Sequence, residues 1–348
     1  RAHATVTFEA AKPGLVLPEA APYTGRLHIR PIGIPAVVRR AHPASCQMLT
    51  KAIAGAFPEA APGWHKGTAG AILIVGGSEG LTGAPHLAAR AALRAGGGLI
   101  SVAAPHGLCR DIKADCPDIM TRALGPAGNV RWSPALLEEL LPFLRQCGGM
   151  VLGPGIGREP ETAAFVQALL MCPSRPSAVV DADALHALAM HPEALSSLRA
   201  CDVLTPHPGE AATLLHTTPA LVQADRFAAL AGLRRLAPSV WILKGAGTLI
   251  GTAGQPVTIA PYAEPNLAVG GSGDVLSGCL GTLMAQTAAH PSEGCESSSF
   301  LAACMGVYLH ARAGTLLRDV FPQRGNSATE IAEMLPRARI GEAAGHGA

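Results

Sequence analysis

The sequence is poor in aromatic and in charged residues. Of its 348 residues, 4% are aromatic and 15% are charged, and the formal net charge is +2. So few aromatic side chains argue against a surface that stacks nucleic-acid bases. A near-neutral charge without blocks of Lys and Arg argues against a nucleic-acid groove or a site on an anionic membrane. We therefore expect no nucleic-acid partner.

Long apolar runs, paired cysteine motifs and a signal-peptide pattern are missing as well. Gly, Pro or charged residues interrupt the apolar segments, so we expect no membrane partner. The nine cysteines include no C-x-x-C pair and cannot all pair internally, which favours reduced thiols. The first residues do not form the charged-then-apolar pattern of a signal peptide. We predict a cytoplasmic protein, and we also expect a homo-oligomer.

What the sequence does have is a regular alternation of apolar strands and helices after Pro62. Hydrophobic residues make up 49% of the chain, enough for one large α/β domain or two small ones. The alternation predicts an α/β fold with a mostly parallel central sheet and helices on both faces. Residues 247–260 add a predicted hairpin. The predicted strands lie within residues 71–77, 99–104, 150–157, 177–185, 202–215 and 240–251.

Glycines and polar residues follow the predicted strands. In open parallel sheets, ligands bind outside the carboxyl ends of the strands. We therefore expect these clusters to line one cleft. The clusters are Gly76-Gly77-Ser78, Gly153-Pro154-Gly155, Asp181-Ala182-Asp183, Thr205-Pro206-His207 and Lys244-Gly245-Ala246-Gly247-Thr248.

The stretch NLAVGGSGDVLSG, residues 266–278, predicts an anion site. Gly270, Gly271 and Gly273 surround Ser272, Asp274 follows, and an apolar run with helical spacing begins. Free amides at a helix N-terminus bind anions readily. Two roles are open for the carboxylate of Asp274. It complements the helix dipole, or it serves a metal or a proton transfer beside a bound phosphate.

Three other clusters carry candidate side chains, and each has a structural alternative. Residues 244–248 offer amides and a hydroxyl to a phosphate, but they can be a plain turn, and Lys244 can pair with a carboxylate. Asp181 and Asp183, two positions apart in an extended segment, suit a hydrated Mg²⁺, but Asp183 can equally cap a helix. His207 lies between two prolines, which either hold it for binding or leave it as a surface histidine.

Six motifs in one order carry a resemblance to a known family. The chain resembles the ADP/ATP-dependent NAD(P)H-hydrate dehydratases of the ribokinase-like superfamily over about residues 55–335. Many relatives read N-P-G-M before the glycine loop, whereas this chain reads EPNLAV, which leaves the shape of the loop around Asn266 open. The motifs are HKGTAGAILIVGGSEGLTGAPHLAARAALRAGGGLISVAAP, VLGPGIG, DADAL, LTPHPGEAATLL, LKGAGTLI and GGSGDVLSG.

The resemblance implies a ribokinase-like fold and the repair of hydrated nicotinamide cofactors. The added hydroxyl of (6S)-NADHX or NADPHX would be phosphorylated by ADP, with ATP as the alternative donor, and loss of phosphate would restore NADH or NADPH. Mg²⁺ is the implied metal cofactor. Asp274 would be the base that accepts the hydroxyl proton.

The remaining site residues are implied by their positions in the motifs. The amides of Gly271, Ser272 and Gly273 would stabilise the charge on the transferring phosphoryl group. The hydrate would contact Ala84, Gly155, His207 and Asp274. The nucleotide would be held by Lys244, Gly245, Ala246, Gly247, Thr248 and Gly273.

The first 40 residues are similar to the end of the NAD(P)H-hydrate epimerase domain that precedes the dehydratase in bifunctional members. They hold two strand-like pieces, residues 5–8 and 26–32, joined by a Pro/Gly-rich loop. Because this is too little for a core, we read residues 1–40 as a remnant of that domain and expect no epimerase activity. We predict a linker over residues 41–54, the dehydratase domain over 55–335 and a tail over 336–348.

Two other functions remain open at this point. A ribokinase-like kinase of a small alcohol, such as a vitamin precursor, would share the glycine loop and the cleft but would release a stable phosphoester. A nucleotide-binding regulatory module would share the anion site without catalysis. Asp274 argues against the module, because a pure phosphate binder has no use for a carboxylate there.

Overall fold

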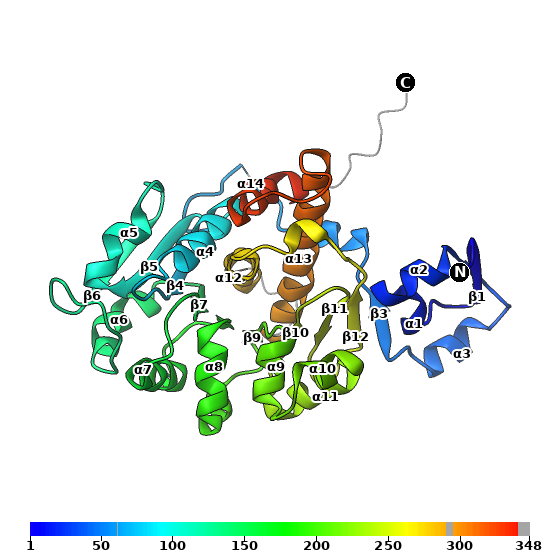
Figure 1. Cartoon of the computed structure of the whole chain (residues 1–348), viewed down its shortest axis with the longest axis horizontal. Coiled ribbons are helices and arrows are strands. Elements are labelled where there is room, and N and C mark those ends of the chain that lie inside the picture. The colour runs from blue at the N-terminus through cyan, green and yellow to red at the C-terminus, as the bar shows by residue number, and fades with distance from the viewer. Residues whose placement is uncertain (61, 290–294, 340–348) are drawn as a thin grey trace.

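A ten-stranded sheet organises the protein, seen in the computed structural model of Figure 1, which describes residues 1–60, 62–289 and 295–339. The order of the strands is β3-β12-β11-β10-β9-β8-β7-β4-β5-β6. These strands are β3 (Cys46–Met48), β4 (Ala71–Val75), β5 (Leu99–Pro105), β6 (Met120–Leu124), β7 (Gly149–Leu152), β8 (Ala178–Val180), β9 (Val203–Leu204), β10 (Val240–Leu243), β11 (Thr248–Gly251) and β12 (Val257–Ala260).

Most neighbouring strands of this sheet are parallel. The antiparallel pairs are β10 with β11 and β11 with β12, which confirms the predicted hairpin. Parallel strands need crossover connections, and helices supply them here. The helices of this part of the chain are α4 (Gly83–Arg94), α5 (Cys109–Lys113), α6 (Leu136–Leu144), α7 (Pro160–Met171), α8 (Asp183–Met190), α9 (Pro208–Leu214), α10 (Pro219–Ala224), α11 (Arg226–Leu236), α12 (Ser272–Ala289), α13 (Cys295–Leu316) and α14 (Ala328–Arg339).

Both faces of the sheet are buried, because successive side chains of a strand point to opposite faces. In β4, Ile72 and Ile74 belong to one hydrophobic core, and Leu73 and Val75 belong to a second one. Residues of α4, α12, α13 and α14 complete the first core, and residues of α6, α7, α8, α9 and α11 complete the second. Figure 1 shows these two sets of helices on either side of the strands. The predicted α/β fold is confirmed.

Two boundaries differ from the sequence-based expectation. We expected a linker over residues 41–54, but Cys46–Met48 form β3, which pairs with β12 at the edge of the sheet. The 3-10 helix η2 (Lys51–Ala56) then packs against α13. We expected a tail from residue 336, but α14 continues to Arg339, and residues 340–348 lie outside the described part of the chain. A three-residue strand is too short to show a periodic pattern, so β3 could not be predicted from the sequence.

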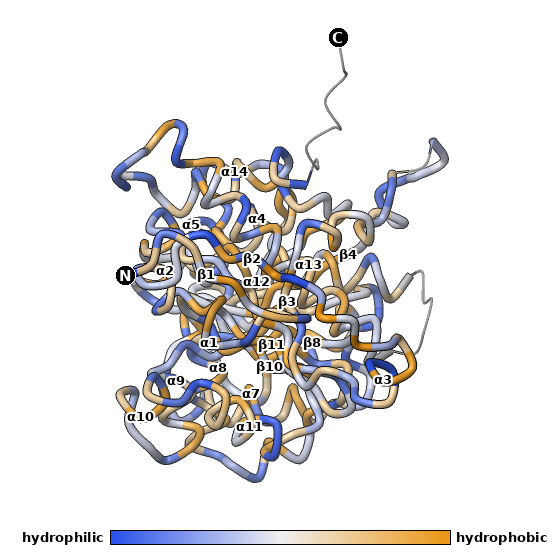
Figure 2. Tube along the Cα trace, turned by 90° about the vertical axis from the view of Figure 1, so that its right-hand side faces the viewer, coloured by the Kyte–Doolittle hydropathy of each residue, from blue (hydrophilic) through white to orange (hydrophobic). Residues whose placement is uncertain are grey.

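Residues 1–41 form a small unit beyond β3, at the right-hand edge of Figure 1. Its strands β1 (Ala4–Phe8) and β2 (Arg26–Arg30) form a separate parallel pair, at the two places where strands were predicted. Figure 2 looks onto this unit. Its assignment to a neighbouring domain stays a prediction. Its helices are α1 (Pro13–Val16), η1 (Pro18–Ala20), α2 (Ala21–Thr24) and α3 (Ala36–Ala41).

One helix in the described part of the chain is long and apolar enough to cross a membrane by length and composition alone. It spans Ser297–Asp319 and includes most of α13. Its apolar window is 72% buried inside the protein, and α13 packs against α12 and α14. A core helix of a soluble fold passes the same test, so this helix is weak evidence for a membrane span.

Candidate active site

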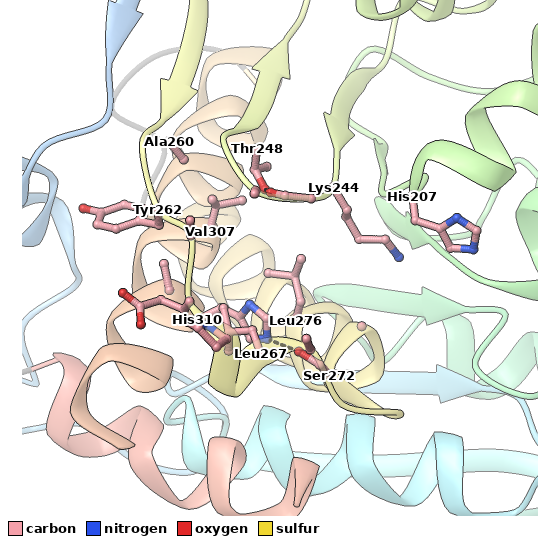
Figure 3. Close-up of a pocket in the computed structure, with 18 of the residues that line it drawn as sticks. His207, Lys244, Thr248, Ala260, Tyr262, Leu267, Ser272, Leu276, Val307 and His310 are labelled. Atoms are coloured by element: carbon pink, nitrogen blue, oxygen red, sulfur yellow. Dashed lines mark hydrogen bonds between the residues drawn. The ribbon is translucent and has the colours of Figure 1, made fainter. Parts of the chain in front are cut away.

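The candidate site lies where the loops after β9 and β10 meet the start of α12. A pocket of about 730 Å³ opens there, and Figure 3 shows the side chains that line it. Lys244 and His207 line one end of the pocket. Three residues of α12, Ser272, Gly273 and Leu276, also line it. The apolar part of the lining includes Ala260, Tyr262, Leu267, Val269, Leu276, Val307 and Ala311.

The start of α12 presents backbone amides, as the glycine motif predicts. Gly271 has φ +88°, a conformation that favours glycine and turns the chain into the helix. The Ser272 amide donates to Val269 O at 3.2 Å and the Val275 amide to Gly271 O at 3.1 Å. Within the described residues, the amides of Gly273 and Asp274 find no acceptor. The Gly271 amide finds no acceptor there either, so within the predicted set only the Ser272 amide is engaged, and Asp274 adds a further free donor.

Lys244 is the cation of the site. Its Nζ atom is 2.8 Å from Oδ1 of Asp181 and 3.8 Å from Oε2 of Glu210. A Cβ atom placed on Gly273 would lie 3.4 Å from the same Nζ. Lys244 thus pairs with a carboxylate, one of the two alternatives, and still reaches the start of α12. A glycine at position 273 keeps the space between the lysine and the helix amides open.

Asp181 is buried and tied to three neighbours. Its Oδ1 accepts from Lys244 and from the Thr205 hydroxyl at 2.7 Å, and its Oδ2 accepts from the Ser277 hydroxyl. Burial opposes ionisation of Asp181, but the charge of Lys244 and the three hydrogen bonds outweigh it and lower the pKa of this carboxyl. Asp181 is therefore an ionised anchor for Lys244.

Asp183 does not share a metal-binding arrangement with Asp181. Ala182 between them has φ +52° and Asp183 begins α8, so the expected extended segment is not formed. Asp183 accepts from Arg158 Nε at 2.7 Å and from the Gly157 amide at 3.2 Å instead. No group of three His, Cys, Asp or Glu side chains in the described ranges is placed to hold a metal ion. The two carboxylates are bonded to different partners, and the pair does not fit Mg²⁺.

Asp274 is the carboxyl group of the site that lacks a partner. It is half-buried, and in the part of the chain that the structure describes no group donates a hydrogen bond to it. Burial and the negative charge of Asp181 raise its pKa to about 7, although Lys244 acts in the opposite direction. A carboxyl group with such a pKa exchanges a proton near neutral pH, as a general base must.

His207 and Glu210 hold each other at the start of α9. The imidazole Nδ1 of His207 accepts from the amides of Gly209 and Glu210, and Glu210 Oε2 accepts from the His207 amide at 2.7 Å. Burial and Lys244 lower the pKa of His207, and burial raises the pKa of Glu210 to about 7 despite the attraction of Lys244. His207 is therefore a neutral, fixed side chain on the pocket wall. The motif pointed to His207, whereas the role of Glu210 as its partner was missed.

The loop of residues 244–248 faces the pocket with its first half. Gly245 and Ala246 are exposed, whereas Gly247 is buried and its amide donates to Tyr262 O at 3.0 Å. The Thr248 hydroxyl donates to Gly245 O at 2.8 Å. The amides of Gly245 and Ala246 are therefore better placed for a phosphate than that of Gly247. Arg226, which no sequence pattern singled out, donates to the carbonyls of Leu243, Lys244 and Gly247.

Ala84 and Gly155 lie side by side, as a shared substrate contact requires. A Cβ atom on Gly155 would lie 3.1 Å from Cβ of Ala84 and 2.5 Å from Leu81 O, and the φ of Gly155 is +58°. Neither Ala84 nor Gly155 lines the large pocket. Of the residues predicted to contact the hydrate, His207 does line it. The predicted nucleotide residues and the Ala84–Gly155 pair thus belong to different parts of the site.

His310 of α13 is a further polar residue of the pocket, and no sequence motif had pointed to it. Its Nε2 is 3.1 Å from the Ser272 hydroxyl, the contact drawn as a dashed line in Figure 3. Burial lowers the pKa of His310 to about 4, against the effect of the hydrogen bond with Ser272, so the imidazole is neutral at physiological pH. The only sequence signal was a histidine on the apolar face of a helix, which ordinarily marks a core position.

Comparison with known proteins gives one consistent family. A family model described as NAD(P)H-hydrate dehydratase matches residues 72–337. The chain is 41% identical over 335 residues to the bifunctional NAD(P)H-hydrate repair enzyme Nnr of Moorella thermoacetica, covering 95% of this chain and 61% of that protein. It is 34% identical over 283 residues to the ADP-dependent (S)-NAD(P)H-hydrate dehydratase of Neisseria meningitidis, covering 79% of this chain and 86% of that protein.

Solved structures show the same fold. A ribokinase-like superfamily protein of Enterococcus faecalis superposes with a TM-score of 0.70 at 21% identity, over 86% of this chain and 96% of that one. The ADP/ATP-dependent NAD(P)H-hydrate dehydratase of Bacillus subtilis, co-crystallised with ATP and Mg²⁺, superposes with a TM-score of 0.64 at 22% identity, over 82% and 94% of the two chains. The chain spans about three fifths of the length of the bifunctional relatives.

Three observations agree with these matches. They are the order of the motifs, the ribokinase-like sheet, and the position of Lys244 and Asp274 at the start of α12. The family model covers well over half of the chain, and the Neisseria relative is matched over most of its own length. The chain belongs to the NAD(P)H-hydrate dehydratase family.

Proposed function

We propose that this chain dehydrates (6S)-NADHX and (6S)-NADPHX, with ADP as the phosphoryl donor, to give NADH or NADPH, AMP and phosphate. The observation that carries the proposal is the carboxyl group of Asp274. It is half-buried, receives no hydrogen bond from the described residues, and has its pKa raised by burial to about 7. It lies in the first turn of α12, where backbone amides are free. A phosphate-binding loop needs no such group, whereas a phosphoryl transfer to an alcohol needs a base.

The proposed reaction balances in two steps. The added hydroxyl oxygen of the hydrate attacks the β-phosphorus of ADP, its proton passes to Asp274, and the bond to the AMP oxygen breaks. The carbon–oxygen bond of the phosphorylated hydrate then breaks and phosphate leaves with the electron pair. A proton passes from the adjacent ring carbon to solvent water, and the double bond of the dihydronicotinamide forms. The free amides of Gly273 and Asp274 and the charge of Lys244 would stabilise the transferring phosphoryl group.

The pocket supports a nucleotide as the phosphoryl donor. Its volume of about 730 Å³ lies in the range of small-molecule sites, and it combines apolar side chains with Lys244 at one end. We assign residues 244–248 and Gly273 to the nucleotide. ADP is the preferred donor because the Neisseria relative is named for ADP, and ATP is the alternative because the Bacillus relative is named for both.

Three finer assignments belong to the same proposal. Mg²⁺ would arrive with the phosphates of the nucleotide, since this ion is commonly held by few protein oxygens and by substrate phosphates. Ala84, Gly155 and His207 would contact the hydrate. A cytoplasmic location and a homo-oligomeric state complete the proposal. The buried free thiols of Cys116, Cys172, Cys279 and Cys304 agree with a reducing compartment.

The test is a turnover assay with purified NADHX and either nucleotide, read from the near-ultraviolet absorbance that the restored dihydronicotinamide gains. We expect NADH to form with ADP, together with equal amounts of AMP and phosphate. Much faster turnover with ATP would contradict the ADP assignment. If NADHX stays unchanged while a small alcohol such as a vitamin precursor becomes a stable phosphoester, the chain is a kinase and the dehydratase proposal is wrong.

A further inference from the structure

The loop of residues 244–248 is held by residues from two distant parts of the chain. Arg226 is the first residue of α11, and Leu17 and Pro18 belong to the small N-terminal unit. Neither part belongs to the six motifs that identify the family. Both contact the loop that the proposed function assigns to the nucleotide.

Arg226 ties the two ends of the loop together. Its side chain is buried, and Nη2 donates to the carbonyls of Leu243 at 3.0 Å, Lys244 at 3.3 Å and Gly247 at 3.4 Å. Nη1 donates to Gln223 Oε1 at 2.7 Å, which fixes the guanidinium plane. Nη2 shares its two N–H groups among the three carbonyls while Nη1 is bonded to Gln223, so the two arms of the planar guanidinium take different partners. An ammonium group has a single nitrogen and cannot occupy both positions of this fork.

The two glycines of the loop make room for this arrangement. Gly245 has φ +129° and Gly247 has φ +65°, values that other residues rarely adopt. A Cβ atom on Gly245 would lie 3.1 Å from Nη1 of Arg226. A Cβ atom on Gly247 would lie 2.7 Å from Cδ of Pro18 and 3.2 Å from Cδ2 of Leu17, which is too close without a shift. The two glycines therefore make room for Arg226, Leu17 and Pro18 on the protein side of the loop, and they also leave the pocket side open to a ligand.

The N-terminal segment is anchored where it meets the loop. Val16 and Leu17 pack against the hydrophobic core that α11 helps to form. Glu19, two residues further on, attracts the guanidinium of Arg226 and so opposes the effect of burial, which lowers the pKa of Arg226. Figure 1 shows α1 beside the edge of the sheet where β3 and β12 lie.

We propose that Arg226 together with Leu17 and Pro18 forms a clamp that holds the loop of residues 244–248 in its nucleotide-binding conformation. The small N-terminal unit is then part of the nucleotide site. This inference rests on the assignment of the loop to the nucleotide in the proposed function. Arg226 is a positioning residue, because it acts on the nucleotide through the loop.

The expected effect is a loss of affinity for the nucleotide. If removal of the guanidinium leaves the loop in the competent conformation about one tenth of the time, the apparent Kd for ADP rises about tenfold. The maximal rate at saturating ADP changes little, because bound nucleotide restores the loop. The apolar side chain of Leu17 lies behind Gly247 and donates no hydrogen bond to the loop, so its truncation should raise Kd by a smaller factor than the loss of the Arg226 guanidinium.

The experiment is calorimetric titration of ADP into the full chain and into variants, with kcat and the KM for ADP measured beside it. The variants are Arg226→Met, Arg226→Lys and Leu17→Ala. We expect the highest Kd for R226M, partial recovery for R226K and an intermediate value for L17A. The matched controls are Arg235→Met, an exposed position on α11, and Tyr23→Ala, a 63% exposed side chain of the N-terminal unit. Both controls should bind ADP like the unmodified chain.

Melting temperatures separate positioning from a purely structural role. Variants that melt earlier but bind ADP with unchanged Kd overturn the clamp, and so do variants whose Kd changes no more than that of the controls. If R226M does not fold, R226K and L17A decide the question. A chain that binds ADP but leaves NADHX unchanged refutes the proposed function, and the Kd series still decides the clamp. A chain that binds neither ADP nor ATP refutes both.

Discussion

Replacing Asp274 with asparagine separates a catalytic carboxylate from a helix-capping one. Asp274→Asn keeps the shape of the side chain but removes its ability to accept a proton. General-base catalysis contributes about 10²- to 10⁴-fold, so we expect kcat to fall by that factor, which corresponds to about 3–5 kcal/mol of activation free energy. ADP affinity should hold or improve, because a negative charge near the phosphates is lost.

The same variant should also change the thermal stability of the chain, in a direction that follows from the pKa of Asp274. The folded-state pKa of Asp274 is raised from 3.8 to about 7, so the folded chain binds the proton more tightly than the unfolded chain. The ionised group therefore costs stability, and this cost develops as the pH rises from about 4 to about 7 and is constant above that range. D274N avoids the cost, so it should melt higher than the unmodified chain at pH 8, and the difference should vanish at acidic pH.

The helix-capping alternative predicts the opposite pattern. A carboxylate that only complements the dipole of α12 stabilises the fold by about 0.3–1 kcal/mol, so its loss would lower the melting temperature and leave turnover intact. The assays are NADHX turnover at saturating ADP and thermal unfolding at two pH values. A folded D274N protein with near-normal kcat and a lower melting temperature at pH 8 would refute the catalytic assignment.

Three further outcomes follow from the structure. First, kcat should rise with pH through a single ionisation near 7 as Asp274 loses its proton, measured as a pH–rate profile; a flat profile between pH 5 and 8 contradicts this. Second, Gly245→Val should weaken ADP binding while the chain still folds, because φ +129° suits glycine; calorimetry showing unchanged affinity contradicts it. Third, Asp202→Ala should lower the free energy of unfolding by about 3–5 kcal/mol, because it leaves the fully buried Arg175 without its bidentate partner; denaturant unfolding that shows a loss below 1 kcal/mol contradicts it.

The inner strands of the sheet could be predicted because burial on both faces leaves a simple sequence pattern. The segments AILIV and LISVAAP are almost continuously apolar, as strands of a covered parallel sheet must be. The edge strands lack this pattern. In β6, Met120 to Arg122 are only half-buried, and β3 has three residues. Edge strands face solvent, so their residues carry no continuous apolar signal.

The parts of the site that one short motif builds could be predicted from the sequence. The parts where residues from distant positions meet could not. The glycine loop places amides and Asp274 by local geometry, and the sequence predicts both. The prediction for Asp181 and Asp183 was wrong in its geometry, because the positive φ of Ala182 ends the extended segment one residue early. Arg226 could not be identified, because its role depends on three carbonyls that follow it by 17 to 21 positions. The contact between His310 and Ser272 could not be predicted either, because the two residues are 38 positions apart in the sequence.

The two aspartates around Lys244 differ in a way that divides their roles. Asp181 holds Lys244 at 2.8 Å and accepts two hydroxyl hydrogen bonds, and these together lower its pKa despite burial. Asp274 receives no such bonds, and the ionised Asp181 adds to the effect of burial that raises its pKa. Carboxyl groups whose surroundings separate their pKa values in this way commonly take different tasks in a reaction. Asp181 therefore keeps Lys244 charged and in place at the anion site, and Asp274 is left as the group that can accept a proton near neutral pH.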